Sequence, residues 1–324
     1  MALRIGVVGV GYLGRHHARI LSSLAGVDLV AAVDINTARA AEVAAANRTR
    51  PLGDFRELLG LVDAVTIAVP TELHRDIAIA FLSAGVPVLV EKPMARSVEE
   101  ADDMIEAAAR AGVVLAIGHT ERFNPAIAAA RPLIDDPRFI EVHRLGTFPD
   151  RSLDIDVVFD LMIHDLDIVL SIVKSDVASV EAVGVPVLTD RVDIANARVR
   201  FVNGCIANIT ASRISRDRVR KVRFFQPAAY VSIDYADQKV AVWRLRKGEG
   251  PKPAIEGGLV EVASEEPLKR ELTDFVEAVA AGRPPLVTGE QGRRALALAQ
   301  AIADKIATDP PPHEDGTMKG TVVS

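Results

Sequence analysis

Short apolar runs alternate with amphipathic stretches over the first 118 residues of the chain. The runs are continuous in Val, Ile and Leu, as in strands that are buried on both faces of a sheet, and they span residues 3–9, 27–33, 64–69, 86–91 and 113–118. The stretches between them carry apolar residues at helical spacing, over residues 13–24, 37–46, 72–84 and 98–111. This alternation predicts repeated strand–helix units on a parallel sheet.

After about residue 120 the pattern changes. A polar, helix-like segment at 121–135 leads to a strand at 139–146 and to a strongly apolar helix at 157–173. Several strands with alternating apolar and polar positions then follow one another between residues 177 and 242, and a loop rich in Gly and Pro is expected at 247–258. Strands without helices between them predict an antiparallel or mixed sheet, and therefore a second domain. Two closing helices are expected at 268–281 and 290–306.

The composition narrows the class of partner. The chain is 49% hydrophobic and 25% charged, with 38 basic against 44 acidic residues and only 10 Phe, 3 Tyr and 1 Trp. An acidic chain with few aromatic side chains lacks the charge and the stacking surfaces of a nucleic-acid binder, so we expect a small-molecule partner and no nucleic acid. No apolar run reaches the roughly 18 residues of a spanning helix, and none resembles a signal peptide. We therefore expect a cytoplasmic protein without membrane contact.

The single cysteine, Cys205, lies in an apolar alternating stretch and is expected to be a buried spectator. The histidines do not fall at the spacing of metal ligands, either with Cys205 or with one another. We therefore predict no metal site.

A glycine-rich hexapeptide, GVGYLG at residues 9–14, closes the first expected strand and opens the first helix. Its glycines permit a tight turn, close approach of the backbone to a pyrophosphate, and close helix–strand packing, and the helix N-terminus favours an anion. Asp34 ends the second strand, where a carboxylate accepts hydrogen bonds from the adenosine ribose and repels the 2′-phosphate of NADP. The motif thus predicts NAD, bound at Gly9, Gly11, Tyr12, Leu13, Gly14 and Asp34. Asp34 could equally begin the next helix as its N-cap.

These patterns together predict an α/β fold in two domains, which agrees with about 150 residues per domain. We expect an N-terminal Rossmann domain, a doubly wound parallel sheet that binds NAD, at residues 1–120. A C-terminal α/β domain on an open mixed or antiparallel sheet is expected at 121–307. A mobile tail is expected at 308–324.

Two features point to proton transfer. Lys92 follows an apolar run at the carboxyl end of the fourth strand, the edge of a parallel sheet where ligands bind. Desolvation there would make it a usable proton-transfer group, although it could also extend into solvent. On the apolar helix, Asp160, His164 and Asp167 share one face at i, i+4 and i+7. They would line a polar cleft or form a solvated acidic stripe with a satisfied histidine. Alcohol oxidation by a nicotinamide needs a base, and Lys92 and His164 could both supply it.

The order of these motifs resembles the Gfo/Idh/MocA oxidoreductases. The residues that carry the resemblance are GVGYLG followed by His17, Asp34, Pro70-Thr71 with His74, Ala84-Gly85 before Glu91-Lys92-Pro93, and the Asp160/His164 pair. The resemblance implies that Pro70, His74, Glu91 and Lys92 also contact the cofactor. It further implies that Lys92 touches the substrate, that His164 is the acid/base, that Asp160 binds substrate or orients the histidine, and that the C-terminal sheet forms the interface of a dimer or tetramer.

A closer likeness is to the branch that oxidises the 3-hydroxyl of UDP-N-acetylglucosamine, for a transaminase that makes the 3-amino sugar of some lipid A. It rests on GHTERFNP at 118–125, SLDID at 152–156 and FQP at 225–227. The glycine pair that often precedes the position of Asp160 is absent, so the pocket should differ from that of the sugar-only members. The substrate ligands expected are Arg122, Asn124, Arg144, Asp160 and His164.

Several alternatives stay open from sequence. The arginine-rich run between Arg213 and Arg223 could bind the substrate diphosphate, or it could be a solvated or interface-forming sheet face. The substrate could be another sugar nucleotide, a free sugar or a cyclitol. A non-catalytic NAD-sensing regulator is disfavoured, because Lys92 and His164 are both present.

Overall fold

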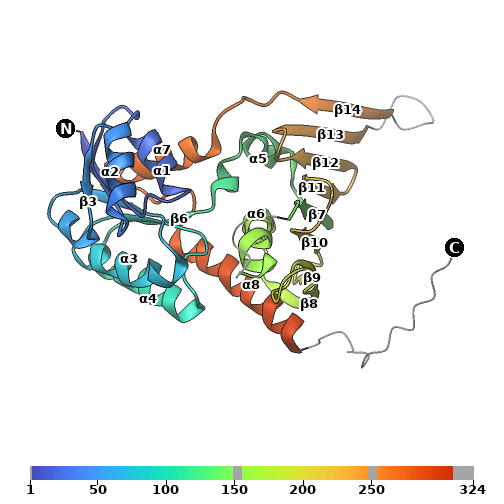
Figure 1. Ribbon diagram of the computed structural model, residues 1–324. Coiled ribbons are helices and arrows are strands. Elements are labelled where there is room, and N and C mark those ends of the chain that lie inside the picture. Colours follow the sequence, from blue (N-terminus) through green and yellow to red (C-terminus); the bar gives the residue numbers. More distant parts are fainter. Residues whose placement is uncertain (1, 149–154, 247–253, 309–324) are drawn as a thin grey trace.

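Two sheets, with helices packed between them, make up the protein (Figure 1). The computed structural model describes residues 2–148, 155–246 and 254–308. Within this part of the chain, no helix combines the length and the apolar character needed to cross a bilayer.

The N-terminal sheet has six parallel strands in the order β3-β2-β1-β4-β5-β6. Their bounds are β1 (Leu3–Val8), β2 (Val27–Val33), β3 (Arg50–Leu52), β4 (Ala64–Ile67), β5 (Val88–Glu91) and β6 (Leu115–Gly118). Helices cover both faces, and this explains why the central strands are continuously apolar. The predicted Rossmann-like parallel sheet is confirmed. The short β3, which contains Pro51 and is largely exposed, was not predicted, because three residues are too few to show the hydrophobic pattern of a strand.

Four helices flank the N-terminal sheet. They are α1 (Gly14–Leu21), α2 (Thr37–Ala46), α3 (His74–Ser83) and α4 (Val98–Ala111). Side-chain caps begin two of them, α2 and α4. The Ser97 side chain accepts the Glu100 N–H at the start of α4, and Gly112 ends that helix in the left-handed region, at φ 66°. The predicted limits of α2 and α4 therefore match the structure.

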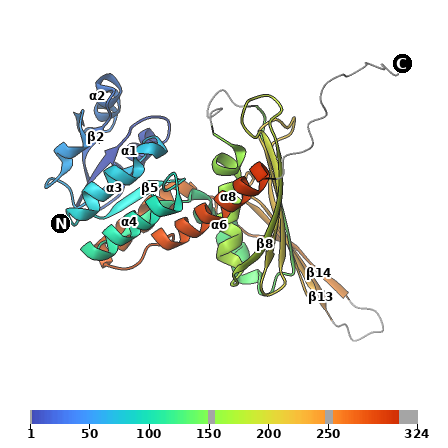
Figure 2. The same cartoon turned by 90° about the horizontal axis from the view of Figure 1, so that it is seen from below.

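The second sheet has eight strands in the order β14-β13-β12-β11-β7-β10-β9-β8. Its strands are β7 (Phe139–Leu145), β8 (Val177–Val185), β9 (Ile194–Phe201), β10 (Ile206–Ser212), β11 (Val219–Gln226), β12 (Ala229–Asp234), β13 (Lys239–Arg246) and β14 (Ala254–Val260). Only β7 and β10 pair in parallel, so the sheet is mixed, as predicted. Helices cover one face, and the other face is bare in the structure (Figure 2).

The helices on the covered face differ in part from expectation. The predicted helix at 157–173 starts as a π-helical turn, η5 (Val158–Met162), before α6 (Ile163–Ile172). The segment at 121–135 forms only the short elements η3 (Thr120–Phe123), α5 (Pro125–Ala130) and η4 (Arg131–Leu133). Pro125 and Pro132 interrupt it, because proline cannot continue a helix that precedes it.

The expectation of a loop at 247–258 is wrong for its last five residues, which belong to β14 and pair with β13. Backbone hydrogen bonds join β14 to β13, so the side chains of β14 give little indication in the sequence that a strand forms there. Residues 247–253 and the expected tail from 309 onward lie outside the described part of the chain.

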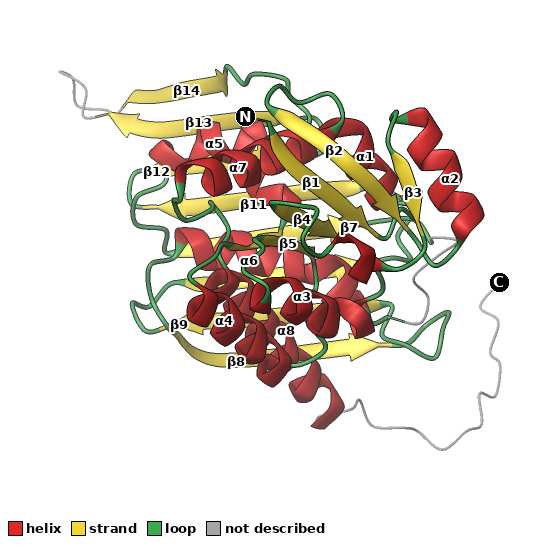
Figure 3. Ribbon diagram, turned by 90° about the vertical axis from the view of Figure 1, so that its left-hand side faces the viewer, coloured by secondary structure: helices red, strands yellow, loops and turns green. Residues whose placement is uncertain are grey.

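The chain returns to the first sheet near its end. Helix α7 (Pro267–Ala281) contributes Leu268, Leu272 and Phe275 to the core beside β1 and α1. Helix α8 (Gly289–Thr308) then packs against α4 as well as α6 and β8. Figure 3 shows the first sheet in front of the second, and α8 contacts elements packed on both sheets. The N-terminal unit therefore includes a segment from beyond residue 265, in addition to the predicted residues 1–120.

Candidate active site

The glycine loop between β1 and α1 leaves no room for side chains at its two ends. Gly9 has φ +83°, and a Cβ there would lie 2.7 Å from the Ala68 carbonyl oxygen. A Cβ on Gly14 would lie 1.7 Å from the Gly9 carbonyl oxygen, so the helix packs directly on the turn. A Cβ on Gly11 would have the Arg39 Nη1 as its nearest neighbour, at 3.8 Å, so the backbone at Gly11 stays open to a ligand. This is the cradle that a dinucleotide pyrophosphate needs.

Asp34 is buried at the end of β2 and is fixed beside this loop. Its Oδ2 accepts the Val10 N–H at 3.1 Å, and its Oδ1 accepts the Asn36 N–H at 2.9 Å. The N-cap of α2 is Asn36 rather than Asp34, because the Asn36 side chain accepts the Arg39 N–H. Arg39, which the sequence analysis missed, places its Nη1 3.5 Å from Asp34 Oδ2. Its position in the first turn of α2, five residues after Asp34, could have indicated from the sequence that the two side chains lie close together.

Lys92 and Asp160 meet although they are 68 residues apart in the chain. The Lys92 Nζ donates to the Asp160 carbonyl oxygen at 2.7 Å and lies 3.4 Å from Asp160 Oδ1. The lysine side chain is 16% exposed, so most of it is out of contact with water. Asp160 lies in the π-helical turn, and such turns are frequent at functional sites.

The residues around Lys92 hold the end of β5 in place. Glu91 is buried, and its Oε1 lies 2.9 Å from the Nε2 of the buried His17. Both ring nitrogens of His74 lie 2.9 Å from backbone carbonyls, those of Val69 and Pro93. Burial lowers the pKa of His74. Both ring nitrogens of His74 already have backbone partners, so the geometry favours a supporting part for His74 rather than direct contact with a cofactor.

His164 lies on α6, one turn after Asp160. Its Nδ1 is buried and has no hydrogen-bond partner among the described residues, and its ring lies edge-on to that of His119 at 6.5 Å between centroids. Burial, together with the positive charges of Lys92 and Arg144, lowers the pKa of His164 well below its ordinary value. The imidazole is therefore neutral near pH 7 and can accept a proton. Lys92, Asp160 and His164 thus form one constellation.

The two arginines predicted to bind substrate are buried in ion pairs. Arg144 binds both oxygens of Asp165, at 2.6 and 3.1 Å, and lies 3.3 Å from Glu121. Burial opposes the charge of Arg144, but Asp165 and Glu121 outweigh it and raise the arginine pKa. Arg122 binds Asp167 at 3.1 Å. Both guanidinium charges are therefore balanced inside the protein, by carboxylates that the sequence analysis did not assign to them.

Asn124, the remaining predicted substrate ligand, is also buried. Its Oδ1 accepts the Ala126 N–H as the N-cap of α5, and its Nδ2 donates to the Tyr235 carbonyl oxygen at 3.1 Å. Its side chain therefore joins η3 and α5 to the second sheet. Residues 152–154 of the SLDID motif lie outside the described residues.

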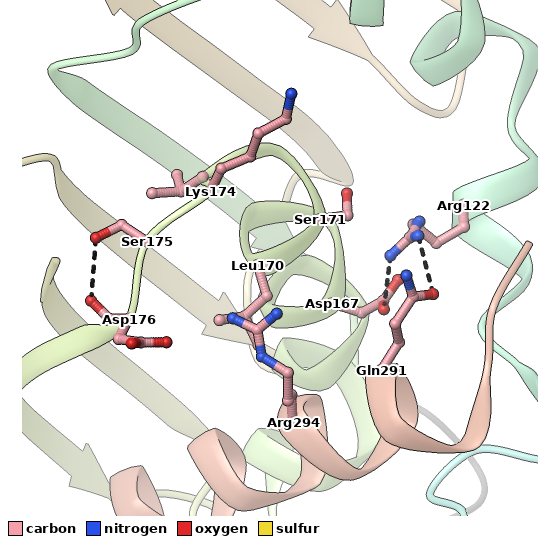
Figure 4. Close-up of a pocket in the computed structure, with 10 residues that line it drawn as sticks. Arg122, Asp167, Leu170, Ser171, Lys174, Ser175, Asp176, Gln291 and Arg294 are labelled. Atoms are coloured by element: carbon pink, nitrogen blue, oxygen red, sulfur yellow. Dashed lines mark hydrogen bonds and ion pairs between the residues drawn. The ribbon is translucent and has the colours of Figure 1, made fainter. Parts of the chain in front are cut away.

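A pocket of about 410 Å³ opens on the side of α6 that carries Asp167 (Figure 4). Arg122 points to Asp167 and Gln291 in its wall, and Lys174 points away from them. Lys92, Asp160 and His164 do not line it. Among the described residues, no group of three His, Cys, Asp or Glu side chains could hold a metal ion.

Two family models match the chain. Residues 3–119 match an oxidoreductase family with an NAD-binding Rossmann fold. Residues 133–226 match the GFO/IDH/MocA C-terminal domain. The first match ends one residue after the last strand of the N-terminal sheet.

Known proteins resemble the chain over nearly its whole length. UDP-N-acetylglucosamine 3-dehydrogenase of Acidithiobacillus ferrooxidans is 43% identical over 305 residues, which cover 93% of this chain and 96% of that protein. A solved structure of that dehydrogenase, GnnA, has a TM-score of 0.90 at 40% identity and covers 95% of this chain and 98% of its own. Inositol 2-dehydrogenase of Rhizobium meliloti is 27% identical over 327 residues, covering 95% and 98% of the two chains. The chain therefore belongs to the Gfo/Idh/MocA family of oxidoreductases and has an NAD-binding Rossmann domain.

Proposed function

We propose that the protein oxidises the 3-hydroxyl of UDP-N-acetylglucosamine with NAD, giving the 3-keto sugar nucleotide and NADH. The observation that carries the proposal is the contact of Lys92 with Asp160 at the carboxyl edge of the NAD-binding sheet, with His164 one helical turn after Asp160 and within electrostatic reach of Lys92. The substrate is proposed from the 43% identity to a UDP-N-acetylglucosamine 3-dehydrogenase over nearly the full length of both chains.

Each residue of the constellation has a defined part in this chemistry. NAD, when bound, would supply the acceptor for the hydride that leaves carbon 3. The neutral His164 imidazole accepts the hydroxyl proton as the hydride leaves. The Lys92 ammonium, held by the carbonyl and carboxylate of Asp160, donates a hydrogen bond to the reacting oxygen and orients it against the cofactor. Gly9, Gly11, Tyr12, Leu13, Gly14, Asp34 and Pro70 would hold the cofactor.

The proposed product suits a following transamination. A transaminase would convert the ketone of the 3-keto sugar nucleotide to an amine, which gives the 3-amino sugar found in some lipid A. A cytoplasmic location, where NAD and nucleotide sugars are both available, stays our prediction.

An assay with NAD and a panel of UDP-sugars tests the proposal. NADH absorbance should rise with UDP-N-acetylglucosamine, and it should rise further when a coupled transaminase removes the ketone. A signal only with another UDP-sugar, a free sugar or a cyclitol would move the substrate to that class. No turnover with any of them, despite NAD binding, would favour a non-catalytic regulator.

We further propose that the bare face of the second sheet joins copies of the chain into a dimer or tetramer. A row of aromatic side chains runs across four strands of this face, in register from one strand to the next: Phe139, Phe225, Tyr230 and Trp243. Trp243 is 46% exposed, which is unusual for so large an apolar side chain. Trp243→Glu should therefore shift the protein to a smaller species in sedimentation velocity, whereas an unchanged oligomer would exclude this face.

A further inference from the structure

The proposed substrate carries a diphosphate, and its charge needs a cation on the substrate side of the cleft. The obvious candidates are already engaged. Arg144 is paired with Asp165 and Glu121, Arg122 with Asp167, and Lys92 with Asp160. Another cation has to meet the diphosphate, and the arginine-rich run around β11 is where the sequence offers one.

Strand alternation divides this run between the two faces of the sheet. Val222 and Phe224 are fully buried against the helices, so Arg220, two residues before Val222, points to the same covered face. Lys221 and Arg223 point to the bare face. There Lys221 pairs with Asp234 at 3.3 Å and Arg223 pairs with Glu141 at 2.7 Å. Those two cations therefore lie on the opposite face of the sheet from Lys92 and His164.

The other arginines of the run lie elsewhere. Arg213 is buried and binds Asp193 at 2.8 Å and the Ile155 carbonyl oxygen at 2.6 Å, so it anchors the segment around residue 190. Arg216 and Arg218 are exposed in the turn that precedes β11, and Arg218 lies 3.4 Å from Thr147.

Arg220 stands at the edge of the catalytic constellation. On the neighbouring strand its register partner is Arg144, and its carbonyl accepts the Tyr235 N–H at 2.8 Å. Its guanidinium is close enough to act electrostatically on both His164 and Asp165. The side chain is exposed, and no hydrogen bond or ion pair joins it to any residue in the described ranges. It is therefore a cation within electrostatic reach of the base, and no carboxylate among the described residues contacts it.

We infer that Arg220 binds the diphosphate of the nucleotide-sugar substrate. The glycine loop on the first sheet would hold the cofactor's pyrophosphate, and Arg220 on the second sheet would hold the substrate's. With the sugar ring at Lys92 and His164, the guanidinium beside His164 meets the group attached to that ring. This inference rests on the proposed function, because only a nucleotide-sugar substrate brings a second diphosphate to the cleft.

The test compares Arg220→Met with Arg223→Met. Both changes remove one positive charge from β11, but Arg223 lies on the bare face, so size-exclusion chromatography should first establish that both variants keep the wild-type assembly. A charge-assisted contact to phosphate is lost in the first variant. The KM for UDP-N-acetylglucosamine and the Kd for UDP, measured by titration calorimetry, should therefore rise about 10- to 100-fold. The KM for NAD should stay unchanged, Arg220→Lys should recover part of the loss, and Arg223→Met should match the wild type.

The outcomes separate this inference from the proposed function. Turnover of UDP-N-acetylglucosamine with the same KM in Arg220→Met would overturn the inference and leave the function standing. If the wild type binds UDP, Arg220→Met weakens that binding, and the wild type does not oxidise UDP-N-acetylglucosamine, the diphosphate site stands and the proposed sugar substrate is wrong. A wild type that neither binds UDP nor oxidises a UDP-sugar would overturn both. A raised KM for NAD in Arg220→Met would assign the residue to the cofactor instead.

Discussion

The cofactor half and the substrate half of the site are built from different groups. The cofactor half relies on backbone: Gly9 and Gly14 allow no Cβ, and two backbone N–H groups fix Asp34. The substrate half relies on buried charges from distant segments, such as Arg144 on β7 and Asp165 on α6. Side-chain changes in the first half should therefore alter cofactor affinity, whereas changes to the buried ion pairs of the second should lower the free energy of unfolding before they alter specificity.

The constellation where the two halves meet should give the largest effect. Lys92→Ala and His164→Ala each remove a group to which we assign the orientation of the reacting oxygen or the uptake of its proton, so kcat should fall about 10²- to 10⁴-fold. Cofactor binding, followed by NADH fluorescence titration, should persist. Lys174→Ala, an exposed lysine just after α6, is the matched control and should keep wild-type turnover. Near-normal kcat in either active-site variant would remove that residue from the chemistry.

Breaking the buried ion pair of the substrate half comes next. Arg144→Met leaves Asp165 buried without its partner, so the free energy of unfolding in urea should fall by about 3–5 kcal/mol. Arg144→Met combined with Asp165→Leu should recover much of this loss, because the fully buried carboxylate is removed together with its partner; Glu121, which also loses Arg144, is 17% exposed and keeps some contact with water. Arg4→Met, which breaks the exposed Arg4–Asp63 pair of the N-terminal domain, should change stability little. Equal losses in Arg144→Met and Arg4→Met would contradict the contrast between the two pairs.

Asp34 tests the cofactor half with a moderate effect. Asp34→Ser removes the carboxylate that we expect to meet the ribose hydroxyls, so the KM for NAD should rise about 10- to 100-fold. The same change releases Arg39, whose guanidinium could then meet a 2′-phosphate, so the KM for NADP should fall. Asp28→Ser, at an exposed position of the same strand, serves as the control. A wild type that prefers NADP would show that the part assigned to Asp34 is wrong.

The pH profile gives the smallest effect. Because the pKa of His164 is lowered in the folded protein, the base stays neutral below its ordinary value of 6.5, and the acid limb of kcat/KM should lie below that pH. Arg220→Met removes a positive charge that acts on His164 less strongly than Lys92 does, so the limb should move upward by a small amount. An acid limb above pH 6.5 in the wild type would show that His164 is not the base.

The same contrast explains how far the sequence could predict the site. Consecutive residues form the glycine loop, and Asp34 follows at a fixed distance, so a local pattern was enough. Lys92, Asp160 and His164 were predicted because each stands out in an apolar segment. Asp165 and Glu121 were not assigned to Arg144, because that contact depends on how α6 and η3 pack against β7. Strands β3 and β14 were missed because backbone pairing with a neighbour, rather than their own side chains, forms them.

The packing of α7 on the first sheet could not be predicted from the order of elements along the chain. Helix α7 follows the second sheet in sequence but packs on the first, because Leu268, Leu272 and Phe275 complete the core beside α1. An amphipathic pattern shows that a helix has a buried face. It does not show which sheet buries it, so the return of the chain to the N-terminal unit could not be predicted.

The position of the transferred hydride tests the central claim most directly. UDP-N-acetylglucosamine carrying deuterium at carbon 3 should be incubated with the protein and NAD, and the reduced cofactor analysed by mass spectrometry. We predict one deuterium in the NADH and a slower reaction than with the unlabelled sugar. NADH without deuterium, formed at the normal rate, would contradict oxidation at carbon 3.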